Sequence, residues 1–142
     1  MFISRKALSS PFQQLFLSRR PIQIFRTMSS TAEAYDECTK KLREITALEG
    51  ISGLLGWDEM VMLPSGSSGC RGDQKSALAG VIYDKKTSAA LGSGLSKLKD
   101  ASNSLNEVQE AVVRDAHKDY VRTAAIPKEL AQRKAALETT AY

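Results

Sequence analysis

The sequence predicts an all-α protein built from about five amphipathic helices, and two observations lead to that prediction. After Ser30, apolar residues recur at three- and four-residue steps, which is the spacing of a helix with one buried face. No stretch alternates apolar and polar residues long enough to indicate a strand, and β-branched residues do not cluster. We therefore expect helices joined by short polar turns and no sheet.

The first helix is expected to begin at a capping box, Ser30-x-x-Glu33, and to run to about Met60. It must end by Pro64, because proline supplies no backbone N–H and collides with the preceding turn. The side chains expected on its inner face are Tyr35, Cys38, Leu42, Ile45, Leu48 and Leu55.

Three glycines of this helix, Gly50, Gly53 and Gly56, follow one another at three-residue steps. A phosphate-binding loop needs a different glycine spacing after a strand, or a Gly-Lys-Ser/Thr ending. Glycines on one side of a helix instead allow another backbone to come close, although each disfavours the helix. We therefore expect close helix packing here rather than nucleotide binding.

Two helices are expected after the loop "PSGSSG". One spans about 71–86, and its apolar face consists of Ala77, Leu78, Val81 and Ile82. The other spans about 88–99, although Gly92 and Gly94 disfavour a helix there. Its apolar residues are Leu91, Leu95 and Leu98.

A second capping box, Ser104-x-x-Glu107, is expected to open a fourth helix. The apolar residues expected on its inner face are Val108, Val112 and Tyr120. A fifth helix is expected from Ile126-Pro127, since proline suits the first helical position. It is still running at Tyr142 without a capping glycine, so we expect this chain to be part of a longer protein.

Residues 1–32 are expected to form a disordered mitochondrial transit peptide. They contain five Lys and Arg residues and no acid, and no unbroken apolar run of the kind a secretory signal needs. Of the 20 basic residues, 15 therefore remain in the rest of the chain against 16 acidic ones. That balance argues against a nucleic-acid surface on residues 33–142. Met28 would also make a sensible start, so a second, cytosolic form is a hypothesis.

No complete catalytic group of residues is found in the sequence. Asp58 and Glu59 are adjacent, so on a helix they point about 100° apart and do not converge as the paired acids of a hydrolase do. His117 is the only histidine and is expected to be exposed to solvent. The two cysteines, Cys38 and Cys70, are far apart and are expected to be free thiols. No apolar run reaches the roughly 20 residues of a membrane helix.

The stretch "LLGWDEMVMLPSG" followed by "CRGDQKSALAGVIYDKKTS" resembles the amino-terminal region of the thermostable (Taq-like) zinc carboxypeptidases. The later segment with Tyr120 and then Pro127-x-x-Leu130 resembles that family as well. The resemblance covers about residues 33–142. The family-signature positions, to which we assign a structural role, are Gly56, Trp57, Asp58, Pro64, Arg71, Gln74, Thr87, Tyr120 and Pro127.

This chain departs from the family pattern in two places. The family usually has Met-Pro-Pro-Gly where this sequence reads "MLPSG", and Tyr83-Asp84 replaces a His-Glu that members often show. Within the signature, Trp57 is expected to anchor the first helix in the core. Asp58 is expected to be paired or capping nearby, and Pro64 to enforce the turn.

The resemblance implies the amino-terminal helical portion of a larger, mostly helical metallopeptidase that removes single residues from the carboxyl ends of peptides. In the family, zinc is held by the two histidines of H-E-x-x-H and a later glutamate, and the Glu inside the motif acts as general base. None of these residues is in this sequence. The resemblance therefore implies a zinc cofactor and peptide substrates for the full-length protein, a possible homodimer, and an inactive chain when these 142 residues stand alone.

A second function class stays open at this point. Amphipathic helices without a recognisable site are also typical of a non-catalytic helical module that binds a partner protein. The reading frame past Tyr142 separates the two hypotheses, because H-E-x-x-H with a later glutamate would indicate the enzyme. A stop codon there would favour the module.

Overall fold

The computed structural model describes the backbone of residues 20–64 and 66–140 and the side chains of residues 30–64 and 66–139. The described chain forms five α-helices and one short 3-10 turn, and it contains no strand. The elements are α1 (Arg20–Val61), α2 (Ser68–Lys86), α3 (Ala89–Asp100), η1 (Ser102–Ser104), α4 (Glu107–Ala124) and α5 (Lys128–Thr140). The all-α prediction is therefore confirmed.

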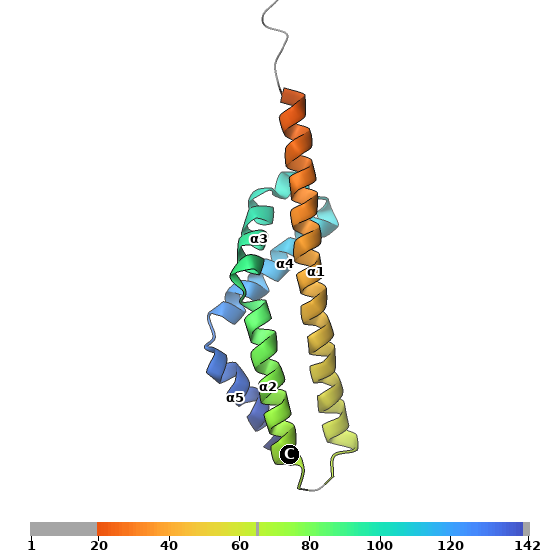
Figure 1. The fold of residues 1–142 in the computed structure, drawn as a ribbon, viewed down its shortest axis with the longest axis vertical. Coiled ribbons are helices and arrows are strands. Elements are labelled where there is room, and N and C mark those ends of the chain that lie inside the picture. Colours follow the sequence, from red (N-terminus) through yellow and green to blue (C-terminus); the bar gives the residue numbers. More distant parts are fainter. Residues whose placement is uncertain (1–19, 65, 141–142) are drawn as a thin grey trace, which may run out of the picture.

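The long helix α1 runs the length of the molecule, and the other helices form two tiers in which α2 and α3 pack against α1, α5 against α2 and α4 against α3 (Figure 1). From the turn at the end of α1, α2 and then α3 run back along it, and α4 and α5 return in the opposite direction. The tier near the α1–α2 turn is formed by α1, α2 and α5, with α2 packed most extensively on α5. The other tier is formed by α1, α3 and α4.

Helix α1 begins at Arg20 and not at Ser30, so the expected capping box lies inside the helix. Pro21 occupies the first turn, where its missing N–H breaks no hydrogen bond, and no further proline or glycine follows before Gly50. Residues 20–32, expected to belong to a disordered presequence, are thus helical, while residues 1–19 lie outside the described part. The targeting role of residues 1–32 stays a prediction.

The core lies where α1, α3 and α4 meet. One cluster consists of Cys38, Leu98 and Val113, with Ala34, Tyr35 and Leu105 against it. The other consists of Ile45, Leu91 and Leu95, with Leu42, Ala116 and Tyr120 against it. The faces predicted for the first and third helices are therefore confirmed by these buried side chains.

The face predicted for α4 is wrong in part. Val108 is 72% exposed and Val112 is 37% exposed, whereas Val113 is buried. The residues that face α1 and α3 are Val113, Ala116 and Tyr120, which follow one another at three- and four-residue steps. Ala116, in the middle of this stripe, is small and so allows the close contact. The prediction from Val108 and Val112 did not include it.

The expected capping box of α4 is also displaced by two residues. Asn106 is the N-cap: its side chain accepts from the backbone N–H of Gln109, and the Gln109 side chain accepts from the backbone N–H of Asn106. Ser104 is used differently, because its hydroxyl donates to the carbonyl oxygen of Ala101 at 2.7 Å within the η1 turn. The reciprocal arrangement is that of a capping box, with different residues from those expected.

Close helix packing occurs at glycines other than those predicted. A β-carbon at Gly92 would meet the Tyr120 ring, and one at Gly94 would lie 2.6 Å from the sulfur of Cys38. The residues that disfavour α3 as an isolated helix are therefore the ones that let it approach its neighbours. In contrast, an added β-carbon at Gly50, Gly53 or Gly56 would meet no atom of the described chain within 4 Å beyond its chain neighbours and the adjacent backbone of its own helix. The close packing predicted for these three is wrong within this chain.

Candidate functional site

Most of the signature residues gather where α1 ends and α2 begins. The Asp58 carboxylate lies 2.5 Å from a guanidinium nitrogen of Arg71. A second nitrogen of the same guanidinium donates to the carbonyl oxygen of Leu55 at 3.3 Å. Arg71 therefore holds α2 against the last turns of α1 through a charged contact and a backbone contact together.

A second ion pair lies one helical turn further along α2. The ammonium of Lys75 is 2.8 Å from the Glu59 carboxylate, and these side chains are only 12% and 11% exposed. The other carboxylate oxygen of Glu59 is buried and has no hydrogen-bond partner among the described residues. This pair is thus partly desolvated, and removing one partner would leave the other poorly compensated.

These contacts decide what the two adjacent acids can do. Asp58 and Glu59 each bind a different cation on α2, so they do not converge on one point. General acid–base chemistry on a bound substrate needs carboxyl groups that face a common space. Asp58 is paired, as expected. Asp58 and Glu59 together hold α1 against α2, each through its own cation.

The turn between the helices accounts for two further positions of the family pattern. After α1 ends, Pro64 accepts a hydrogen bond from the backbone N–H of Ser67 at 3.1 Å through its carbonyl oxygen. Gly66 has φ +90°, a conformation that residues with a side chain rarely adopt. The prediction that α1 runs to about Met60 and ends by Pro64 is confirmed by its last residue, Val61.

Of the remaining signature residues, Thr87 and Pro127 lie at helix ends and Tyr120 packs between helices against the core, whereas Gln74 does neither. Gln74 lies on the exposed side of α2, 3.7 Å from the sulfur of Cys70. Thr87 caps the end of α2, and its hydroxyl donates to the carbonyl oxygen of Tyr83 at 2.8 Å. Pro127 directly precedes α5, and its carbonyl oxygen accepts from the N–H groups of Leu130 and Ala131. None of these contacts brings them to a common centre.

Trp57 does not anchor the core as expected. Trp57 is 54% exposed, and a β-carbon added at Gly56 beside it would meet nothing within 4 Å. The end of α1 contacts α2 through Leu55, Asp58 and Glu59, so Trp57 lies on the side of the helix that faces away from α2. The prediction is wrong for this chain because only one face of this part of α1 has a partner.

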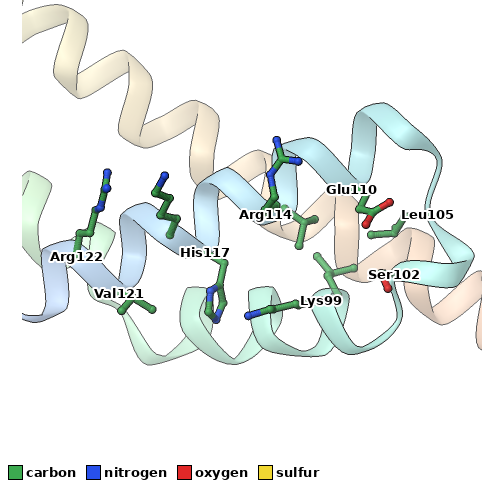
Figure 2. A pocket seen from close by; sticks show the side chains of 11 residues that line it. Lys99, Ser102, Leu105, Glu110, Arg114, His117, Val121 and Arg122 are labelled. Carbon is green, nitrogen blue, oxygen red and sulfur yellow. The ribbon is translucent and has the colours of Figure 1, made fainter.

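A groove of about 710 Å³ lies between α3 and α4. Its apolar lining is Leu98, Leu105, Val113 and Val121, and its basic residues are Lys99, Arg114, Lys118 and Arg122. Figure 2 shows Glu110, Arg114, His117, Val121 and Arg122 along α4, with His117 directed toward the α3 side near Lys99. Contrary to expectation, His117 is half-buried.

The groove offers an apolar surface with a basic rim but no nucleophile arrangement. Ser102, Glu110 and His117 all line it, yet no hydrogen bond joins any two of the three in the described part of the chain. A nucleophilic site would need such a bond between the attacking group and its base. The sequence signal for this groove is the spacing of Glu110, Arg114, His117 and Val121 along one side of α4, which sequence reasoning missed.

The described residues hold no group of three or more His, Cys, Asp or Glu side chains that could bind a metal ion. These residues therefore offer no set of ligands that fits a metal ion. Both cysteines are free: Cys70 is exposed, and burial raises the pKa of the Cys38 thiol. No helix within the described ranges is both long and apolar enough to cross a membrane.

Comparison with known proteins gives two matches. The family model described as carboxypeptidase Taq (M32) metallopeptidase matches residues 37–142. The chain is also similar to thermostable carboxypeptidase 1 of Thermus thermophilus, with 29% identity over 110 residues. The aligned part is 76% of this chain and 22% of that relative, so the match spans less than a quarter of the relative's length. No solved structure matches.

Proposed function

The chain belongs to the carboxypeptidase Taq (M32) metallopeptidase family, and we propose that it forms the amino-terminal helical portion of a metal-dependent carboxypeptidase acting on peptides. The observation that carries this proposal is the family match over residues 37–142, which includes every signature position. The joint between the end of α1 and the start of α2 adds support, because the Asp58–Arg71 ion pair and the turn at Pro64 explain the place of these three residues in the signature.

Within that protein, these helices supply structure and not the reacting groups. Asp58 and Glu59 are paired with Arg71 and Lys75. The whole sequence contains one histidine. Since a site with two histidine ligands cannot be built from one, we propose that the metal ligands lie outside these 142 residues. We propose zinc as the metal. When bound, such an ion lowers the pKa of its water and polarises the scissile carbonyl.

The test is the longer protein. The transcript is read past Tyr142 in the same frame, and the encoded protein is purified and incubated with peptides of defined carboxyl ends. We expect H-E-x-x-H and a later glutamate, release of carboxyl-terminal residues, loss of release with a chelator, and recovery with zinc. A stop codon at this point, or a longer protein without such release, would contradict the proposal and favour a helical interaction module.

We also propose that residues 1–32 direct the protein to mitochondria. The absence of acids and the presence of Arg5, Lys6, Arg19, Arg20 and Arg26 support this, because such presequences are rich in arginine and poor in acids. A fluorescent protein fused to residues 1–32 should enter mitochondria, and the same fusion with all five cations changed to glutamine should not. A form starting at Met28 should stay in the cytosol.

Finally, we propose that the full-length protein is a homodimer, as the family resemblance implies. Light scattering on the purified full-length protein should give twice the mass of one polypeptide. A single-polypeptide mass at micromolar concentration would contradict this part of the proposal.

A further inference from the structure

One face of the second half of α1 is apolar and has no partner in the described chain. Residues 50–57 read "GISGLLGW" and contain no charge. The large side chains of this face are exposed: Leu54 is 62%, Trp57 54% and Val61 57% exposed. These three recur at three- and four-residue steps and therefore form one stripe along the helix. We refer to Gly50, Gly53, Leu54, Trp57 and Val61 as the α1 outer face.

The glycines give this face a specific shape. An added β-carbon at Gly50 or Gly53 would meet nothing within 4 Å, so the backbone at both positions is open to a close approach. Glycine disfavours a helix relative to alanine. At Gly92 and Gly94 this loss is offset because Tyr120 and Cys38 come close, but at Gly50 and Gly53 nothing in the described chain offsets it. Without side chains at Gly50 and Gly53, the backbone of a second helix can come close to α1 at this face.

The opposite side of the same turns is already occupied. Leu55, Asp58 and Glu59 contact α2 through Arg71 and Lys75. The α1 outer face therefore stays available after all the helices described here have packed. A continuous uncharged, exposed apolar surface of this kind marks a contact site in a soluble protein.

We propose that the α1 outer face is the docking surface for an apolar helix from the part of the same polypeptide that follows residue 142. This inference rests on the proposed function. We infer this occupant from length, because the chain aligns with only 22% of the relative. An occupant in the same polypeptide also avoids the loss of translational freedom that a separate partner incurs on binding.

The test compares one glycine substitution in two contexts. Gly53→Ala is made in the 142-residue chain and in the longer protein, with Gly69→Ala as the matched control, since an added β-carbon at Gly69 on α2 also meets nothing within 4 Å. In the 142-residue chain Gly53→Ala should raise the thermal midpoint by about 2–4 °C, because alanine favours the helix. In the longer protein the added methyl should collide with the docked helix and lower the midpoint, while Gly69→Ala does not lower it.

Fluorescence of Trp57 gives a second readout, since it is the only tryptophan of the 142 residues. Its emission should be that of a solvent-exposed indole in the 142-residue chain. The difference spectrum between the longer protein and its Trp57→Phe variant should show emission at shorter wavelengths, as for a buried indole.

The outcomes separate the two proposals. A higher midpoint for Gly53→Ala in both contexts, with Trp57 exposed in both, would overturn the docking inference and leave the proposed function intact. Concentration-dependent dimers of the 142-residue chain that Trp57→Ser abolishes would assign the face to a second copy and would also overturn it. A stop codon after Tyr142 would refute the proposed function, and the docking inference with it.

Discussion

Replacing Lys75 with methionine removes one half of an ion pair that solvent barely reaches. The ammonium lies 2.8 Å from the Glu59 carboxylate, and the two side chains are 12% and 11% exposed. Removing one partner of a buried pair costs about 3–5 kcal/mol of unfolding free energy, because the remaining charge stays desolvated and uncompensated. Some water still reaches both side chains, so we expect about 3 kcal/mol for Lys75→Met.

The matched control is Lys85→Met on the same helix. Lys85 lies 2.7 Å from Glu44, nearly the same separation, but these side chains are 39% and 57% exposed. An exposed pair contributes about 0–1 kcal/mol, since water solvates both charges before and after the change. The two variants thus share chemistry, geometry and helix, and differ mainly in burial.

Urea unfolding followed by circular dichroism gives the free energy of each variant by linear extrapolation. A double variant, Glu59→Leu with Lys75→Met, should return to within about 1 kcal/mol of the original chain, because an apolar pair carries no desolvation penalty. If Lys75→Met and Lys85→Met cost the same small amount, the account of a desolvated joint between α1 and α2 is refuted.

Four other expectations concern the core and the thiols. Leu95→Ala should cost about 2–5 kcal/mol in the same urea experiment, because this side chain has no exposed surface and its removal leaves a cavity. Gly92→Ala should lower the unfolding midpoint, although alanine favours helices, because its methyl would meet the Tyr120 ring; a higher midpoint would contradict the packing of α3 on α4. Cys70 should react with a thiol reagent well before Cys38, measured by mass spectrometry of the alkylated chain, because Cys38 is buried. Burial raises the pKa of the Cys38 thiol. The stability that this neutral, buried thiol contributes is therefore complete below its ordinary pKa of 9.0, and it is lost as the pH rises from there through the folded-state pKa.

The sequence predicted well what depends on local periodicity. The three leucines of α3 recur at three- and four-residue steps, and all are buried. The end of α1 was set by Pro64, because proline cannot continue a helix. Asp58 and Glu59 were predicted to diverge, and their separate partners on α2 follow from the roughly 100° between neighbours on a helix.

What the sequence could not predict depends on which helix lies beside which. Three-residue glycine spacing indicates a close approach, but it does not say whether the approaching helix belongs to the same 142 residues. The burial predicted for Trp57 failed for a related reason. Apolar character predicts burial only where a neighbouring helix covers the side chain, and the sequence does not show which helix that is. The groove beside His117 arises from the pairing of α3 with α4, which is a tertiary feature.

The start of α4 illustrates a local ambiguity. Ser104-x-x-Glu107 and Asn106-x-x-Gln109 both fit the pattern of a capping box, and they overlap in sequence. The choice is made by the 3-10 turn, which uses the Ser104 hydroxyl for the Ala101 carbonyl and so leaves Asn106 to cap the helix.

The most direct test of the central claim, that these helices provide structure without the metal chemistry of the family, is a peptide-release assay on the purified 142-residue chain. The chain is loaded with excess zinc, dialysed, analysed for bound metal and incubated with peptides of defined carboxyl ends. We expect far less than one zinc per chain and no release above a blank without protein. One tightly bound zinc per chain, together with chelator-sensitive release of carboxyl-terminal residues, would contradict the claim.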